Sequence, residues 1–170
     1  MRETEVLKGL DDYLSYPVIF AEQAGPKPSY PYISIKETMS FIPAGNQPFI
    51  TDEDLPEDIK RTATSQPTMS LSITAYSDTL NDASDVAQQA HDWFTFGGYR
   101  LLKEAGLVVA DIESVMNRDS LIVDDYERRR GFDVILRFVH SISRVVEEIK
   151  VVKGKVNDDP FLSKRSDLIE

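Results

Sequence analysis

The 170-residue sequence contains no cysteine. Disulfide bonds, thiolate metal sites and thiol catalysis are therefore excluded for this chain. No stretch approaches the roughly 18 consecutive apolar residues that a membrane-spanning helix needs. The first residues carry acids where a secretory signal peptide needs a basic end and an apolar run. We therefore expect a protein that is made and kept in the cytoplasm, away from any membrane.

Residue patterns that mark an active site are also missing. His91 and His140 have no second histidine at the spacing of a metal site. The pair Gly97-Gly98 lacks the following Lys-Ser/Thr of a phosphate-binding loop, and no Gly-x-Ser-x-Gly nucleophile elbow occurs. We therefore expect no catalytic residue, no bound metal and no cofactor.

One enzyme-like pattern supplies an alternative. Asp124 lies upstream of Glu148-Ile149-Lys150, which loosely matches the acid…acid-x-Lys arrangement that holds Mg²⁺ beside a scissile phosphate. Such chemistry requires the three polar side chains at neighbouring strand positions. Short matches of this kind arise often by chance, and a net charge of −10 disfavours the gripping of a phosphate backbone. A Mg²⁺-dependent nuclease is therefore only the alternative hypothesis.

Two segments have the periodicity of amphipathic helices. In residues 3–16, Val6, Leu10 and Leu14 recur every four positions. Residues 80–96 repeat the pattern and end at a glycine pair, and a shorter helix is expected at 99–105. These segments predict two main helices, each with one apolar face.

The remaining apolar segments have the character of strands. Residues 68–76 alternate strictly between apolar and hydroxyl side chains, which is typical of a strand with one buried face. Shorter strands are expected at 18–20, 32–36, 107–115 and 119–125, and a long final strand at 132–146. We therefore predict an α+β fold in which the two main helices pack on one face of a mostly antiparallel or mixed sheet.

Three segments interrupt this pattern. Residues 24–32 contain three prolines and are expected to form a stiff, extended connection. Residues 43–58 are expected to form a long loop or hairpin insertion, and 150–170 a charged C-terminal arm or tail that follows a single domain at 1–149. The insertion concentrates acids that we predict to be solvated or to face a partner or a lumen: Asp52, Glu53, Asp54, Glu57 and Asp58. It lacks the alternating spacing and the turn glycine of a calcium loop.

The densest charge cluster lies just before the predicted final strand. It runs from Asp124 to Gly131 and contains three consecutive arginines flanked by acids. Planar guanidinium groups suit carboxylates of another chain, and Arg and Tyr are enriched at interfaces. A solvated turn is the alternative interpretation. We predict that a subunit interface includes these residues: Tyr126, Glu127, Arg128, Arg129 and Arg130.

Four segments of the sequence resemble a known family. The most distinctive are Pro-Lys-Pro-Ser-Tyr-Pro-Tyr at 26–32 and Tyr-Glu-Arg-Arg-x-Gly-Phe-Asp at 126–133. Residues 16–23 and Asn117-Arg118-Asp119 add to the resemblance, which covers roughly residues 1–145. On these segments the chain resembles phage neck proteins, or tail terminators, that complete tails and join them to heads.

The resemblance implies a function in the virion. Such proteins are α+β proteins that form rings, typically of six copies, at the head-proximal end of the tail. They end polymerisation of the tail tube and offer a surface to the head connector or stopper, and in contractile tails they also meet the sheath. DNA crosses the lumen without specific binding, and assembly takes place in the cytoplasm of the bacterial host. A phage structural adaptor without terminator activity is a further alternative.

Overall fold

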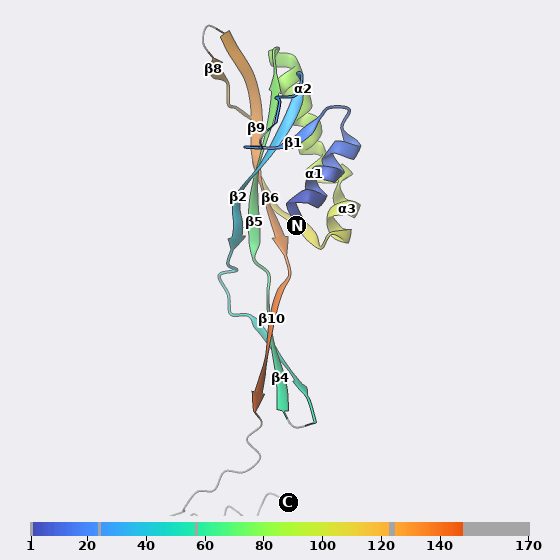
Figure 1. The fold of residues 1–170 in the computed structure, drawn as a ribbon, viewed down its shortest axis with the longest axis vertical. Helices are drawn as coiled ribbons and strands as arrows, with labels where there is room; N and C mark the ends of the chain where they lie inside the picture. Colours follow the sequence, from blue (N-terminus) through green and yellow to red (C-terminus); the bar gives the residue numbers. More distant parts are fainter. Residues whose placement is uncertain (1, 24, 57, 123–124, 148–170) are drawn as a thin grey trace, which may run out of the picture. The chain divides into compact units, whose positions relative to one another are not determined.

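The computed structural model describes residues 2–23, 25–56, 58–122 and 125–147, with only the backbone described at 122, 125, 126 and 147 (Figure 1). By its internal contacts the chain divides into two compact units. The first comprises Met1–Phe49 and Ala63–Ile142, and the second comprises Ile50–Thr62 and Ser143–Glu170. The predicted domain boundary at 149/150 lies outside the described residues, so it stays a prediction.

The two predicted main helices are present in the first unit. The first is α1 (Arg2–Tyr13), which ends three residues before the predicted limit. The second is α2 (Leu80–Asp92), which continues into the π-helical turn η1 (Trp93–Gly97) and is followed by α3 (Tyr99–Glu104). Thr79 caps α2 because its side chain accepts a hydrogen bond from the Asp82 N–H at 3.2 Å.

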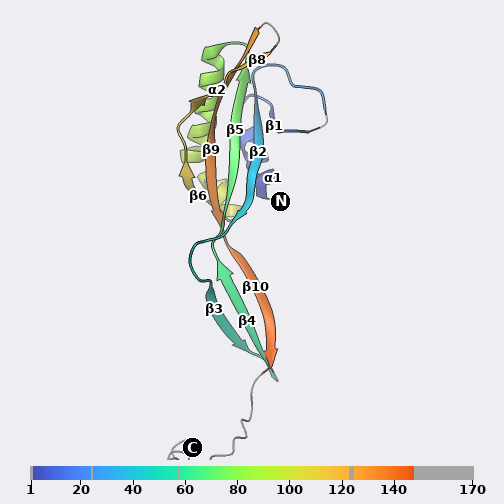
Figure 2. The ribbon, with the colours of Figure 1, turned by 90° about the vertical axis from the view of Figure 1, so that its left-hand side faces the viewer.

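The main sheet has the strand order β1-β2-β5-β9-β6, and two short strands also pair with β9. Only the pairing of β1 with β2 is parallel among the pairings described for this sheet, so the sheet is mixed, as predicted. Figure 2 shows β6, β9, β5 and β2 side by side. The strands are β1 (Val18–Phe20), β2 (Tyr32–Ile42), β5 (Thr68–Ser77), β6 (Leu107–Ile112), β7 (Met116–Asn117), β8 (Ser120–Ile122) and β9 (Asp125–Phe138).

The helices cover one face of the main sheet (Figure 1). The predicted alternation of 68–76 places Leu71 and Ile73 on that face, and both are at most 1% exposed. From β9, Phe132 and Val134 join them, and Leu10 of α1 packs into the same core. This burial confirms the predicted α+β class.

A second sheet contains three strands in the order β10-β4-β3. They are β3 (Phe49–Asp54), β4 (Asp58–Ser65) and β10 (His140–Glu147), and we call them the small sheet. The Leu55 N–H donates to the Asp58 carbonyl at 2.8 Å and closes the turn between β3 and β4. The hairpin insertion is thus confirmed.

Two sequence-based boundaries are wrong in this region. Irregular structure was expected throughout 43–58, but residues 49–54 form β3 and residue 58 begins β4. Cross-strand pairing of charges stabilises this hairpin, and such pairing is invisible in local composition. The single strand expected at 132–146 is divided into β9 and β10 at Val139, and β9 begins already at Asp125.

Candidate functional site: a charged network that joins distant segments

The arginine triplet lies within β9 rather than in a turn before it. Because side chains alternate along a strand, the triplet is divided between the two faces of the main sheet. Arg128 and Arg130 share the side of Phe132, which is the helix-covered face. Arg129 lies on the opposite face together with Glu127. The triplet therefore takes part in two separate clusters of charge.

The first cluster is centred on Asp119, between β7 and β8. Its Oδ1 accepts hydrogen bonds from the Arg130 guanidinium at 2.7 Å and from the Arg129 N–H at 2.8 Å. Its Oδ2 accepts from Arg128 at 3.3 Å. Burial opposes ionisation of Asp119, but these donors outweigh it and hold the pKa of the carboxyl below its ordinary value of 3.8.

The second cluster is centred on Glu127, whose side chain is 4% exposed. One carboxylate oxygen accepts from the Lys27 ammonium and the Tyr30 hydroxyl, and the other accepts from Arg129 Nε at 2.7 Å. Burial opposes ionisation, but the hydrogen bonds from Lys27, Tyr30 and Arg129 hold the pKa of Glu127 below 4.5. Burial also disfavours the charged form of Lys27, yet its bonds to Glu127 and Tyr30 raise its pKa above 10.5.

Stacked tyrosine rings line this second cluster. The ring centroids of Tyr30 and Tyr32 are 5.8 Å apart, and those of Tyr32 and Tyr76 are 4.7 Å apart. The Arg129 guanidinium lies 5.1 Å from the centroid of Tyr76. Burial raises the pKa of Tyr32 to about 12, so its hydroxyl stays protonated at neutral pH. The stack holds the proline-rich segment against β5 and β9.

Arg118 forms a third group on the same face of the sheet as Glu127. Its guanidinium donates to Asp133 Oδ1 and to Ser72 Oγ, both at 2.7 Å. Gly131 makes this approach possible, because a Cβ at that position would lie 2.5 Å from the Ile73 carbonyl oxygen and 3.0 Å from Arg118 Cδ. Burial opposes ionisation of Asp133, but Arg118 and Ser72 hold its pKa below 3.8.

These contacts bring together three of the segments on which the family resemblance rests. Lys27 and Tyr30 come from the segment 26–32, Asp119 from the segment 117–119, and Glu127 from the segment 126–133. In the described part of the chain, no buried side-chain nitrogen or oxygen lacks a hydrogen-bond partner. The network therefore fixes distant segments in place, and its charges already have partners.

The reason for predicting an interface at the arginine triplet needs correction. The prediction rested on the suitability of guanidinium groups for carboxylates of another chain, but Asp119 and Glu127 of the same chain pair with all three arginines. The interface itself stays a prediction. Arg128 has the most exposed side chain of the three, at 37%. The side chain of Tyr126 lies outside the described residues.

Two acids of the insertion, Asp52 and Glu53, also have partners in the chain. Asp52 pairs with Arg61 at 2.6 Å and Glu53 with Lys60 at 3.3 Å, each between β3 and β4. The hydrogen bond from Arg61 lowers the pKa of Asp52. Asp54 is exposed and Asp58 half-buried. Glu57 lies outside the described residues, as do Asp124, Glu148 and Lys150 of the nuclease-like pattern.

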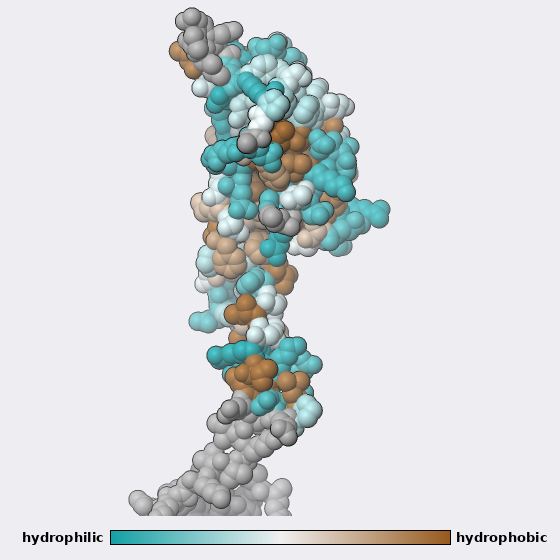
Figure 3. Space-filling view, viewed as in Figure 1, coloured by the Kyte–Doolittle hydropathy of each residue, from teal (hydrophilic) through white to brown (hydrophobic). Residues whose placement is uncertain are grey.

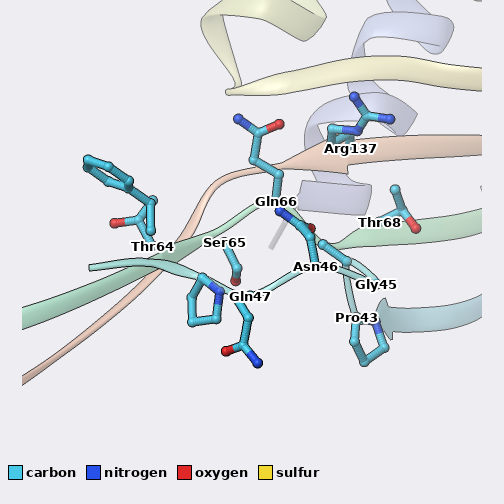
Figure 4. Close-up of a pocket in the computed structure, with 12 residues that line it drawn as sticks. Pro43, Gly45, Asn46, Gln47, Thr64, Ser65, Gln66, Thr68 and Arg137 are labelled. Atoms are coloured by element: carbon cyan, nitrogen blue, oxygen red, sulfur yellow. The ribbon is translucent and has the colours of Figure 1, made fainter. Parts of the chain in front are cut away.

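No group of three or more His, Asp or Glu side chains among the described residues could hold a metal ion. Figure 4 shows a cleft of about 910 Å³ lined by the loop 43–49, by residues at the junction of β4 and β5, and by Arg137. The side chains that line it are neutral except for Arg137, so this cleft lacks a general base.

The chain is thus an α+β protein in which ion pairs around Asp119, Glu127 and Asp133 connect segments that are far apart in the sequence. A model of the family described as phage neck terminator protein matches residues 4–159. The chain belongs to this family. The match confirms the resemblance and runs further than predicted, because it includes part of the tail beyond residue 145. A search of the curated proteins found no match.

Membership makes this chain a phage neck protein, which implies a place in the virion. Among the described residues, no helix is long and apolar enough to cross a membrane.

Proposed function

We propose that this protein forms a ring at the head-proximal end of a phage tail, ends polymerisation of the tail tube and joins the tail to the head connector. The observation that carries the proposal is the family match over residues 4–159. The protein acts through binding rather than catalysis. Its charged clusters are consistent with this, because each acid at their centres is already bound to cations of the same chain.

The proposed assembly is a closed ring of identical copies, with six as the expected number. In such a ring each copy uses two different surfaces, and the contacts end when the rotation closes. The tail tube protein binds one side of the ring and the head connector or stopper the other, and in a contractile tail the sheath is a further partner. DNA passes through the lumen without specific binding, which the net charge of −10 favours.

Two surfaces are proposed to face partners. The first is the start of β9, from Tyr126 to Arg130, which we propose lies at a subunit contact. Arg128→Glu tests it better than a change at Arg129, because Arg129 also holds the buried Glu127. Arg100→Glu is a suitable control, since Arg100 is 90% exposed and pairs only with Glu104 among the described residues. Because Arg128 also pairs with Asp119, loss of rings with Arg128→Glu supports this contact only when the variant keeps the unfolding transition of the parent, and unchanged rings contradict it.

The second proposed surface is the acidic insertion 52–58, which faces a partner or the lumen. Its acids on β3 are exposed in the described chain.

The length of tail tubes tests the proposed function. Tails assembled in cells without this protein should contain overlong tubes without heads, and supplying the protein should restore one length. Tubes of normal length that merely lack heads would instead identify an adaptor without terminator activity. Mg²⁺-dependent cleavage of plasmid DNA by the purified protein would favour the nuclease alternative.

A further inference from the structure

The part of the small sheet that belongs to the second unit shows no core among its described residues. It consists of residues 50–54 of β3, 58–62 of β4 and 143–147 of β10. None of its described side chains is buried, and those of 50–54 and 143–145 are all exposed. Figure 3 shows apolar side chains at the surface in the region of the small sheet. A sheet of three strands normally needs a hydrophobic face or a covering layer to be stable.

The hydrogen bonds of this sheet define its register. Asp52 lies opposite Arg61 and Glu53 opposite Lys60, so β3 and β4 run antiparallel. The hydroxyls of Thr62 and Ser143 are 2.8 Å apart, which places β10 on the other side of β4.

The two outer strands, β3 and β10, each leave one edge of backbone N–H and C=O groups unpaired in the described chain. Open edges of this kind are templates for pairing with another chain.

The two edges differ in charge at particular positions, with acids at 52–54 of β3 and a cation at Arg144 of β10. Asp54 on β3 and Arg144 on β10 form no ion pair with any described residue, and both are exposed. Asp54 shares a face of β3 with Asp52, two residues away, and Asp52 lies opposite Arg61. Because Thr62 lies opposite Ser143 in the antiparallel pairing of β4 with β10, Arg144 lies opposite Arg61 on that same face. The edge of β3 is acidic over 52–54. On β10, Arg144 lies in the middle of the strand and Glu147 at its end, and most of the other residues carry hydroxyl or β-branched side chains.

We propose that β3 of one copy pairs with β10 of a second copy, so that the small sheets of neighbouring subunits join into one continuous sheet. This inference rests on the proposed ring. Both outer strands run antiparallel to β4 and hence parallel to each other. When the axis of the ring runs along these strands, the rotation that relates neighbouring copies leaves the strand direction unchanged. The strand β3 of one copy therefore pairs in parallel with β10 of the next. Arg144 then lies beside the acids of β3.

Charge favours this contact over two-fold pairings. A two-fold contact between two copies of β3 would oppose the acids at 52–54 with themselves, which is unfavourable. A two-fold contact between two copies of β10 would close a dimer and leave the acidic edge open. The pairing of β3 with β10 uses both edges of every copy and leaves none unpaired when the ring closes.

Engineered cysteines test the contact directly, because the natural chain contains none. If Arg144 lies beside Asp52, then Thr51 is next to Ser143 of the neighbouring copy, and Thr51→Cys with Ser143→Cys should cross-link. If Arg144 lies beside Asp54, Glu53→Cys with Ser143→Cys should cross-link instead. Within one copy these positions are separated by β4, roughly 10 Å, which exceeds the reach of a disulfide.

The expected result is a ladder of disulfide-linked chains that ends at the ring size, on a non-reducing denaturing gel of oxidised tails or purified rings. Each single variant alone should give none, and a mixture of the two single variants should give dimers only. Cross-linking by Ser143→Cys alone would show a two-fold contact and overturn the proposal. Rings without cross-links from either double variant would overturn it as well.

An exchange of charges tests the register in which Arg144 lies beside Asp54. In that register, Arg144→Asp and Asp54→Arg should each weaken ring assembly by about fivefold per contact, as measured by sedimentation, and the double variant should restore it. Arg100→Asp serves as a control for general charge effects. Failure of the double variant to recover, together with cross-linking of Glu53→Cys to Ser143→Cys, would contradict the role given to these charges.

The two proposals fail in different ways. If neither the purified protein nor the tail holds more than one copy, the ring itself is refuted. If rings form and cap tails but ignore both the cysteine pairs and the charge exchange, only the pairing of β3 with β10 is refuted.

Discussion

The strands of the main sheet and of the small sheet have very different surroundings. In β5, Leu71 and Ile73 are at most 1% exposed, whereas in β10 Ile142 is 62% and Val145 60% exposed. The main sheet derives its stability from apolar area buried under the helices. The small sheet has no such layer among the described residues, so its side chains and edges are available to another chain. The comparison separates a sheet with a buried core from the sheet that we propose takes part in assembly.

The largest expected effect is a loss of stability when the core of the main sheet is truncated. Phe132 is 0% exposed, and Phe132→Ala should lower the free energy of unfolding by about 3–5 kcal/mol. Ile142→Ala on β10 should change it by less than about 0.5 kcal/mol. Urea unfolding of the two variants measures both. Similar losses of unfolding free energy in the two variants would mean that Ile142 is packed in the isolated protein. The contrast between the main sheet and the small sheet would then not hold.

A second expected effect concerns the close packing of Gly98 against the ring of Trp93. At Gly98 an added Cβ would lie 2.4 Å from the Trp93 ring, whereas at Gly45, in the loop before β3, nothing lies within 4 Å. Gly98→Ala should therefore cost about 1–3 kcal/mol through overpacking, and Gly45→Ala should be close to neutral. Melting temperatures of the two variants provide the measurement. A neutral Gly98→Ala would show that the helix end yields more readily than described.

A third expected effect is a dependence of stability on pH. The folded-state pKa values of Glu127, Asp119 and Asp133 are all lowered. Their contribution is present in full above the ordinary values of 3.8 and 4.5, and it is lost as the pH falls through the folded values. Glu127→Gln should cost about 1–3 kcal/mol at pH 7 and should flatten this acid slope.

Urea unfolding between pH 2.5 and 7, with a spacing of about half a unit, measures that slope. The matched control is Glu104→Gln, which alters an exposed helix pair with Arg100. An acid slope that is unchanged in Glu127→Gln would contradict the assignment of Glu127 to the network.

The elements in which apolar residues recur at a regular spacing could be predicted from the sequence. The alternation at 68–76 and the four-residue repeat of Val6 and Leu10 are set by burial on one face, so they appear in the sequence itself. The start of β9 could not be predicted in this way, because Arg128 to Arg130 are charged and are held in a strand by pairing with β5. The same holds for β3, whose acids are offset by Lys60 and Arg61.

The network around Glu127 also lay beyond sequence reasoning. Lys27 and Glu127 are 100 residues apart, and no local pattern connects a proline-rich segment to an arginine-rich one. The signal that could have found it was that both segments carry the family resemblance. Segments that are characteristic of a family without any catalytic chemistry are candidates for mutual contact in the fold.

Hydrogen exchange of the backbone amides tests the central contrast most directly. In the isolated chain, the account predicts slow exchange in β5 and much faster exchange in β3 and β10. In rings or on tails, the amides of β3 and β10 should slow while those of β5 stay unchanged. Outer strands that are as protected as β5 in the isolated chain, or that exchange equally fast before and after assembly, would contradict it.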